Sequence, residues 1–388
     1  MRTIHCLNPI SKVGLDTLPK NYQITTELQK ADAILVRSAS MHDMVLPESV
    51  LAVARAGAGF NSIPFENLAK QGVVVFNTPG ANANAVKELI IAGMLLASRD
   101  IYGGIQWLNN NKTDDQIAKT VEKAKAQFGG TEIYNKTIGI IGLGAIGKLL
   151  ARACSALGMK VIGTDAFLDS VLAVKDTLPS DMVFVKTNAE LYPKCDFISV
   201  NVPLMPETKY MINKAAFSQM KDGVVLLNFA RDLLVNDDDL KEAIQSKKVR
   251  KYVTDFPNNQ TAQMEGVIAI PHLGASTEEA EDNCAVMAVH QIVEYIENGN
   301  IINSVNYPNL NAGTPKRKSR LSMIYEMDKN FVELAKKIAE CGNKVIQFIH
   351  VEKNGFGYAN IDCDHEIDHI TVDAINNLAG MIKVRKIK

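Results

Sequence analysis

Short apolar runs alternate with helix-patterned stretches over about the first 300 residues of the chain. Two of these runs, at 33–38 and 72–77, read as buried strands, and each ends in polar or turn residues. A strongly apolar helix is predicted at 85–98. Strands that alternate with helical patterns are typical of a parallel sheet with crossover helices. We therefore predict an α/β fold.

An apolar strand predicted at 137–141 runs directly into Gly142, Gly144 and Gly147. A helical pattern and a second strand follow at the spacing of a βαβ unit. Glycines at these positions permit a tight turn, close approach of the backbone to a pyrophosphate, and close packing of helix on strand. The helix N-terminus offers unpaired N–H groups to the phosphates. Together these features predict a dinucleotide-binding unit rather than an ordinary turn.

Asp165 ends the second strand of this unit, at 160–163. Its carboxylate can accept hydrogen bonds from both hydroxyls of an adenosine ribose, and its charge would repel a 2′-phosphate. The sequence thus favours NAD over NADP. Further elements are predicted after it: strands at 196–200, 223–228 and 251–255 and a long helix at 277–298.

The stretch 308–320 lacks apolar periodicity and reads as a basic, solvated linker. The residues after it predict a strand at 321–325, a helix at 330–341, strands near 344–351 and 357–363, a helix at 370–378 and a strand at 381–387. This βαββαβ order is that of a small ferredoxin-like domain.

A chain of 388 residues predicts two or three domains. Its net charge of −1 gives no bulk field that would favour nucleic acid or an acidic membrane. The longest apolar run, 89–97, is about half a membrane span, and the N-terminus lacks the apolar core of a secretory signal. Six scattered cysteines without a CxxC pair suit reduced thiols. We expect a cytoplasmic protein with neither a nucleic-acid nor a membrane partner.

Two side chains at strand ends suggest redox chemistry on a hydroxy acid. His272 follows an apolar strand, and an imidazole can take the hydroxyl proton when a nicotinamide cofactor accepts hydride. Arg231 ends another strand, and a guanidinium can hold a substrate carboxylate in a bidentate fork. Asp255 ends the next strand and could hold the nicotinamide carboxamide or ribose. The alternatives are a capping or core histidine, a salt-bridged arginine and an acidic turn residue.

In the first α/β stretch, Arg37 and Ser38 end one predicted strand, and the loops at 56–61 and 77–82 end others. Backbone N–H groups of such loops, together with Arg37 and Asn82, can form an anion pocket. We predict that this pocket holds a carboxylate or phosphate of a small-molecule substrate.

The stretch 363–369 contains His365 and His369, whose spacing can bind metal when both lie on one helix face. It instead occupies a strand-to-helix junction, with an aspartate at the expected helix cap. Soft and hard ligands are also mixed without a recognised spacing. We predict no metal site.

With these residues in place, the chain resembles the D-2-hydroxyacid dehydrogenase family from about Arg37 to Pro308. The resemblance rests on Arg-Ala-Gly-Ala-Gly at 55–59, Gly-Leu-Gly-Ala-Ile-Gly at 142–147, Asn-Val-Pro at 201–203, Asn-Phe-Ala-Arg at 228–231 and Pro-His-Leu-Gly-Ala-Ser-Thr-Glu-Glu-Ala at 271–280. The last segment is close to a signature of the phosphoglycerate branch, and the C-terminal unit is similar to an ACT regulatory domain.

The resemblance implies NAD-dependent oxidation of D-3-phosphoglycerate to 3-phosphohydroxypyruvate, the first step of serine biosynthesis, by a homodimer or homotetramer. A dehydrogenase for lactate or for glycerate and hydroxypyruvate would share the catalytic residues. A non-catalytic NAD-sensing protein on the same scaffold is a further alternative. The implied fold has two Rossmann-like lobes and an ACT-like domain. The ranges are 1–99 with 280–307 for the substrate lobe, 100–279 for the NAD domain, 308–320 for the linker and 321–388 for the ACT-like domain.

Residue roles follow from the matching motifs. His272 is the implied catalytic acid/base and Arg231 the carboxylate clamp. The implied NAD site comprises Gly142, Gly144, Ala145, Ile146, Gly147, Asp165, Val202, Pro203, Phe229, Ala230, Arg231, Asp255, His272 and Ala275. The implied phosphoglycerate site comprises Arg37, Ser38, Ala58, Gly59 and Asn82.

One position departs from the family pattern. The family pairs its histidine with a glutamate a few residues after the aspartate that Asp255 matches, but a direct count places Gln260 there. The nearest downstream acid is Glu265. Either Glu265 reaches His272 through a loop shift and acts as its catalytic partner, or His272 has no carboxylate partner.

Overall fold

The computed structural model describes residues 1–327, 336 and 345–387. They form two compact units, Met1–Asn82 with Glu278–Lys388 and Ala83–Thr277. The break after Asn82 places α3 (Ala83–Ser98) in the second unit, whereas the sequence analysis assigned it to the first lobe. The C-terminal strands are grouped with the first unit, and a separate ACT-like domain at 321–388 stays a prediction. The assignment of a substrate lobe and an NAD lobe to exact ranges stays a prediction.

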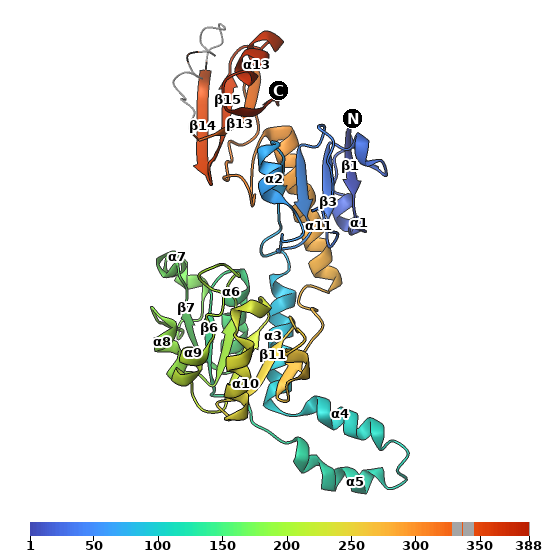
Figure 1. Ribbon diagram of the computed structural model, residues 1–388, viewed down its shortest axis with the longest axis vertical. Helices are drawn as coiled ribbons and strands as arrows, with labels where there is room; N and C mark the ends of the chain where they lie inside the picture. The colour runs from blue at the N-terminus through green and yellow to red at the C-terminus, as the bar shows by residue number, and fades with distance from the viewer. Residues whose placement is uncertain (328–335, 337–344, 388) are drawn as a thin grey trace. The chain divides into compact units, whose positions relative to one another are not determined.

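The first unit is built on a parallel five-stranded sheet with the order β2-β1-β3-β4-β5 (Figure 1). Successive residues of a strand face opposite sides of a sheet. Leu35 of β3 therefore packs in the cluster that includes α11, while Ile34 packs with Leu68 of α2. The bounds are β1 Arg2–Cys6, β2 Tyr22–Thr25, β3 Ala33–Val36, β4 Ala52–Arg55, β5 Val74–Phe76, α1 Lys12–Leu15, α2 Phe65–Lys70 and α11 Glu278–Val293.

The strands predicted at 33–38 and 72–77 are confirmed as the shorter β3 and β5. The long helix predicted at 277–298 is confirmed as α11, which continues into a π-helical turn at Glu294–Asn298. Gly299 ends that turn in the left-handed conformation, with φ +70°.

The second unit holds a parallel seven-stranded sheet with the order β12-β11-β10-β9-β6-β7-β8. The first six strands of this unit follow the doubly wound Rossmann order, with β12 added at one edge. The bounds are β6 Thr137–Ile141, β7 Lys160–Thr164, β8 Val183–Phe184, β9 Phe197–Val200, β10 Val224–Asn228, β11 Val249–Thr254 and β12 Val267–Ala269. The strands predicted after the glycine motif are confirmed.

Helices cover both faces of this sheet (Figure 1). On one face, Ile90 of α3 and Leu150 of α6 pack in one buried cluster; on the other, Phe217 of α9 and Leu240 of α10 pack in a second. The bounds are α4 Ile101–Asn110, α5 Ile117–Ala124, α6 Ala145–Ala156, α7 Leu168–Leu172, α8 Asn188–Leu191, α9 Lys214–Gln219 and α10 Asp237–Gln245. No helix in the described ranges has the length and apolar character needed to cross a membrane.

The C-terminal sheet is antiparallel, with the order β14-β15-β13-β16, which is the ferredoxin-like order. Its bounds are β13 Ser319–Glu326, β14 Val345–Lys353, β15 Phe356–Cys363, β16 Met381–Lys386 and α13 His369–Asn376. The helix predicted at 330–341 lies outside the described residues. Asp368 caps α13 by accepting a hydrogen bond from the Thr371 amide, as the cap prediction expected.

β13 begins at Ser319, so the stretch predicted as linker ends inside a strand. The reason is a buried ion pair across β13 and β15: Arg320 is 1% exposed and Asp362 is 5% exposed. Arg320 Nε and Nη2 donate to the two carboxylate oxygens of Asp362 at 2.6 and 2.7 Å. The other guanidinium hydrogens reach the main-chain oxygens of Asn298, Ala312 and Gly313.

A second set of hydrogen bonds joins this sheet to the rest of the first unit. Tyr358 Oη and Asn360 Nδ2 both donate to the main-chain oxygen of Gly299, each at 2.8 Å. A Cβ at Gly299 would overlap Ser322 Oγ, so a glycine is needed for this close approach as well as for its positive φ. The C-terminal sheet is thus fixed to the end of α11 and its following turn.

Candidate active site

The glycine loop joins β6 to α6 in the geometry that the sequence predicts. Gly142 has φ +93°, and a Cβ there would stand 2.8 Å from the main-chain oxygen of Asn201. A Cβ at Gly147 would overlap the main-chain oxygen of Gly142, so helix and strand pack too closely for a side chain. Gly144 is the N-cap of α6, and a Cβ there would meet no atom within 4 Å. The loop therefore leaves open space beside free helix N–H groups, which fits a dinucleotide pyrophosphate.

Asp165 lies directly after β7 and is bound to the glycine loop. Its Oδ2 accepts a hydrogen bond from the Leu143 amide at 2.7 Å, and its Oδ1 accepts one from the Phe167 amide at 2.8 Å. A carboxylate has about four acceptor positions, so each oxygen can still accept a further hydrogen bond. This arrangement fits the predicted contact with ribose hydroxyls.

The loops after β9 and β10 carry other predicted cofactor residues. Val202 flanks the glycine loop, since its Cγ1 would lie 2.9 Å from a Cβ at Gly142. Asn228, which is fully buried, donates from Nδ2 to the Arg231 main-chain oxygen at 2.8 Å and accepts from the Ala230 amide at 3.2 Å. One buried amide therefore fixes the turn that presents Arg231. Because β6 and β9 are neighbours, the glycine loop after β6 and the loop after β9 adjoin the crevice where the strand order reverses.

Asp255 follows β11 and is 1% exposed. Its Oδ2 accepts a hydrogen bond from the Gly274 amide at 3.0 Å, whereas its Oδ1 is buried and has no hydrogen-bond partner in the described part of the chain. Burial raises the pKa of Asp255, while the Gly274 amide and the nearby His272 and Arg231 oppose that shift. A buried acceptor without a donor fits a ligand that brings one, such as a carboxamide.

The structure brings His272 and Arg231 against one aromatic ring. The Phe256 and His272 ring centroids are 4.4 Å apart with planes inclined by 47°, and Arg231 Cζ lies 5.1 Å from the Phe256 centroid. Burial lowers the pKa of the Arg231 guanidinium, and Asp255 and Asp232 oppose this shift. The sequence analysis did not single out Phe256. Its position directly after Asp255 at a strand end was the available signal.

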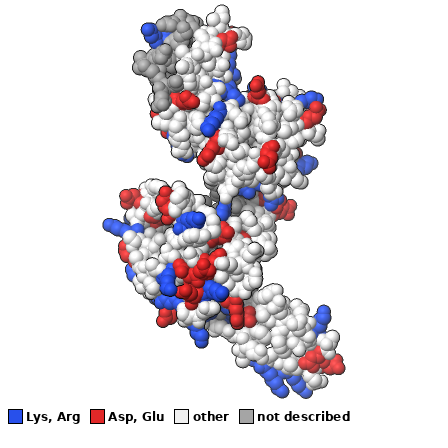
Figure 2. All heavy atoms as spheres, in the orientation of Figure 1, with Lys and Arg blue, Asp and Glu red and all other residues white. Residues whose placement is uncertain are grey.

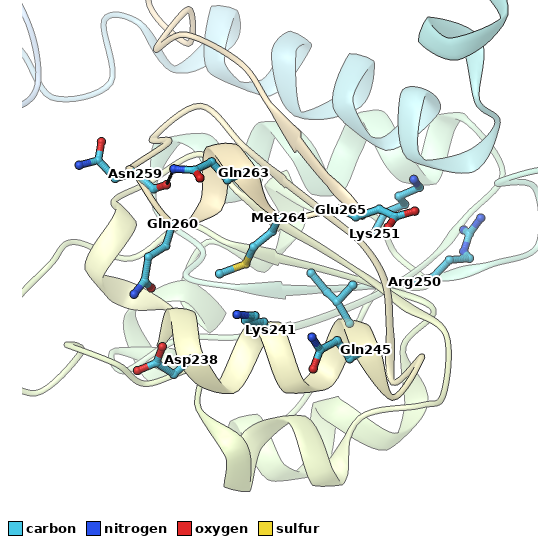
Figure 3. Close-up of a pocket in the computed structure, with 12 residues that line it drawn as sticks. Asp238, Lys241, Gln245, Arg250, Lys251, Asn259, Gln260, Gln263, Met264 and Glu265 are labelled. Atoms are coloured by element: carbon cyan, nitrogen blue, oxygen red, sulfur yellow. Dashed lines mark hydrogen bonds between the residues drawn. The ribbon is translucent and has the colours of Figure 1, made fainter.

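Glu265 and Gln260 lie elsewhere. Both line an open groove of about 770 Å³ between α10 and residues 259–266 (Figure 3). Glu265 lines it together with Arg250 and Lys251 at the start of β11. It precedes β12, whereas His272 follows that strand, so β12 separates them. The structure therefore does not bring Glu265 to His272, and the loop shift considered above is not observed.

The predicted anion-binding residues of the first unit occupy loops after neighbouring strands. Asn8 Oδ1 accepts hydrogen bonds from the amides of Arg37, Ser38 and Ala39 at 3.0–3.1 Å, which fixes the loop after β3. The Arg37 guanidinium forms an ion pair with Glu281 of α11. Neither Asn8 nor Glu281 was expected from the sequence, because both act through tertiary contacts.

Arg55 links the loops after β3 and β4. Its Nε donates to the Arg37 main-chain oxygen at 3.0 Å, and its Nη1 donates to the Gly59 main-chain oxygen. Asn77 Nδ2 donates to the Ala58 main-chain oxygen at 2.6 Å and fixes the other side of the same turn. One hydrogen-bonded region thus holds four residues of the predicted set, Arg37, Ser38, Ala58 and Gly59. The fifth, Asn82, ends the segment that follows β5.

Comparison with known proteins gives consistent matches. Residues 91–274, inside the second unit, match the family model of the D-isomer specific 2-hydroxyacid dehydrogenase, NAD binding domain. The D-3-phosphoglycerate dehydrogenase of Methanocaldococcus jannaschii is 30% identical over 316 residues, which cover 79% of this chain and 58% of the relative. That of Mycobacterium leprae is 34% identical over 276 residues, covering 68% of this chain and 49% of the relative. The chain thus spans about half to three-fifths of the length of these relatives.

Among solved structures, the NAD⁺-bound 3-phosphoglycerate dehydrogenase of Entamoeba histolytica matches with a TM-score of 0.62 and 25% identity. The match covers 80% of this chain and 99% of that one. A glyoxylate reductase matches with a TM-score of 0.63 at 24% identity, which shows a shared fold.

Proposed function

Because the chain belongs to the D-isomer specific 2-hydroxyacid dehydrogenase family, we propose that it oxidises D-3-phosphoglycerate to 3-phosphohydroxypyruvate with NAD, the first step of serine biosynthesis. One observation carries the proposal: His272 and Arg231 meet at Phe256, on the carboxyl side of the sheet that carries the glycine loop. In this arrangement His272 would be a proton acceptor beside Arg231, which would bind the carboxylate. The relatives' names supply the choice of substrate.

When bound, NAD supplies the hydride acceptor that this oxidation requires. Glycine-loop N–H groups would bind its pyrophosphate, and Asp165 would bind the ribose hydroxyls and disfavour a 2′-phosphate. Asp255 Oδ1 would accept a hydrogen bond from the carboxamide. The other proposed cofactor contacts are Ala145, Ile146, Val202, Pro203, Phe229, Ala230, Arg231, His272 and Ala275.

The chain's own residues would handle the proton and the charges of the substrate. His272 would take the hydroxyl proton as the carbon–oxygen double bond forms, and would return it in the reverse direction. Arg231 would hold the substrate carboxylate with two parallel N–H donors. We further propose that Arg37, Ser38, Ala58, Gly59 and Asn82 form the anion-binding site of the first unit.

Two other functions compete with this one. Dehydrogenases for lactate or glycerate need the same His272 and Arg231. The proposed anion-binding loops of the first unit and the names of the relatives favour a phosphorylated substrate. An NAD-sensing binding protein is favoured by a single observation, the absence of Glu265 from the surroundings of His272. The retained pair of His272 and Arg231 argues against that function, since sensing alone requires neither.

Steady-state NADH formation from D-3-phosphoglycerate, D-lactate and D-glycerate tests the proposal. We expect kcat/KM to be highest for D-3-phosphoglycerate, and comparable values for all three would exclude a phosphate-specific enzyme. With the best substrate, we expect at least about a tenfold preference for NAD over NADP, equivalent to about 1.4 kcal/mol. Equal kcat/KM values for the two cofactors would contradict the role given to Asp165.

We also propose a homodimer or homotetramer in the cytoplasm. Helix α4 has no buried residue, and the side chains of Ile101, Tyr102, Ile105 and Leu108 are 38–61% exposed. Such a row of apolar side chains on one helix is unusual on a monomer and suits a contact with a second copy. Light scattering of Ile105→Asp against the wild type tests this contact.

The five cysteines that the structure describes are free thiols, which supports the proposed cytoplasmic compartment.

A further inference from the structure

We propose that Phe256 is a positioning residue, which orients His272 and Arg231 where the described part of the chain provides no carboxylate that is hydrogen-bonded to the histidine. The proposal rests on the proposed function, because it concerns the two side chains that would handle the substrate. An apolar ring would then orient the histidine, a role expected of Glu265 or, in the family pattern, of a glutamate at the position of Gln260.

The backbone and the side chain of His272 are held in different ways. The backbone is in the left-handed conformation, with φ +48°, and its amide donates to the Ile270 main-chain oxygen at 3.0 Å. The imidazole is exposed and makes no hydrogen bond within the described part of the chain. Its specific contact is the Phe256 ring, at a centroid distance of 4.4 Å. The ring is therefore the group that limits where the imidazole can point.

The same ring contacts the Arg231 guanidinium, whose Cζ lies 5.1 Å from the centroid. Within the described part of the chain, the guanidinium makes a single hydrogen bond, from Nη1 to the adjacent Ala230 main-chain oxygen at 2.6 Å. An aromatic ring attracts a cation and offers it a flat surface to rest on. One rigid side chain thus sets the spacing between a proton acceptor and a carboxylate clamp.

Two charged side chains, Asp255 and Arg231, lie near the imidazole and its Phe256 contact. Phe256 and Asp255 come from the end of β11, and Arg231 comes from the turn after β10. The Oδ2 atom of Asp255 accepts a hydrogen bond from the Gly274 amide, and no hydrogen bond joins Asp255 to the imidazole in the described part of the chain. Phe256 is uncharged, so it cannot replace the full negative charge of a carboxylate. Its main contribution is therefore orientation.

A leucine at position 256 keeps apolar bulk and removes the flat ring. We expect Phe256→Leu to lower kcat and to raise KM for the hydroxy acid, each by about tenfold, because small misplacements of reacting groups are costly. The dissociation constant of NAD should stay within about twofold of the wild type. Phe256→Tyr keeps the ring and should restore both constants. Phe184→Leu is the matched control, since Phe184 is a half-buried phenylalanine on the opposite edge strand β8.

A spectroscopic measurement tests the contact without any turnover. The ring current of Phe256 should change the NMR chemical shifts of the imidazole protons of His272. These resonances are identified by their loss in His272→Asn. We expect Phe256→Leu to move them and Phe184→Leu to leave them in place. Unchanged resonances in Phe256→Leu would overturn the proposal.

Kinetics then separates positioning from simple packing. If Phe256 acts through His272, Phe256→Leu should lower kcat far less in a His272→Asn background than in the wild type. Equal losses in both backgrounds, or wild-type kcat and KM in Phe256→Leu, would overturn the proposal. A wild-type protein that forms no NADH from any hydroxy acid would refute the proposed function, while the resonances of His272 would still decide whether Phe256 holds the imidazole.

Discussion

Two buried carboxylates of this molecule differ in how completely their oxygens are hydrogen-bonded. Asp362, in the C-terminal sheet, has both oxygens bound by Arg320. Asp255, at the end of β11, is buried more completely, with 1% exposure against 5%, yet one of its oxygens has no partner in the described part of the chain. The more deeply buried group is thus the less satisfied one.

We interpret this difference as that between a structural site and the proposed ligand site. A buried ion pair tolerates desolvation only when its lone pairs and hydrogens are satisfied, and the Arg320 network achieves this with carboxylate and main-chain acceptors. Asp255 retains an unused acceptor beside His272 and Arg231. Perturbed, incompletely paired groups of this kind concentrate at functional sites.

The largest effect on stability should come from disrupting the hydrogen-bond network of Arg320 and Asp362. Arg320→Met removes one partner of a buried pair and leaves Asp362 without compensation, which should cost about 3–5 kcal/mol. We expect hydrogen exchange of β13 and β15 in the full chain to rise accordingly. The control Lys318→Met changes an exposed neighbour and should leave exchange unchanged. Similar exchange in both variants would show that the network contributes little.

A smaller effect, on activity, should follow from changing Arg231, the proposed substrate clamp. Arg231→Lys keeps the charge but replaces the planar fork with a point charge, so kcat/KM for D-3-phosphoglycerate should fall by about 10- to 100-fold. Arg250→Lys, in the groove beside Glu265, is the matched control and should stay near the wild type. A wild-type kcat/KM in Arg231→Lys would place the carboxylate elsewhere.

Asp255→Asn should raise the stability of the fold modestly and lower its affinity for NAD. The raised pKa of Asp255 means that the folded state holds its proton more strongly than the unfolded state. Stability should therefore fall as pH rises through the window above the ordinary carboxyl pKa, and this contribution is absent in Asp255→Asn. At neutral pH the variant should be more stable, while its affinity for NAD falls.

Urea unfolding at acidic and neutral pH, together with NAD titration, measures both changes. A variant that is less stable than the wild type at neutral pH would show that the Asp255 charge is well compensated in the fold.

The smallest effects should come from two residues of the groove, Glu265 and Gln260. Glu265→Gln and Gln260→Glu should each change kcat by less than about twofold and leave the acidic limb of the pH–rate profile in place, because both residues line the groove beside α10. A marked shift of that limb in either variant would mean that the groove residue reaches His272 during catalysis.

The sequence predicted those features that depend on local pattern. The glycine loop, its flanking strands and the cap at Asp368 follow from residue type and spacing over short segments. The Phe256 contacts and the Glu281 partner of Arg37 did not follow, because they join segments far apart in sequence or depend on how side chains turn. The unit break at Asn82 was missed because α3 is apolar enough to suit either lobe, and its packing on α6 decides the matter.

The most direct test of the account is NADH formation from D-3-phosphoglycerate by the wild type and by His272→Asn, with NAD affinity measured in parallel. General acid–base help of the proposed kind predicts turnover by the wild type and a loss of about 10²- to 10⁴-fold in kcat for the variant, with NAD affinity nearly unchanged. A wild-type protein that binds NAD but forms no NADH, or a variant that keeps the wild-type kcat, would contradict it.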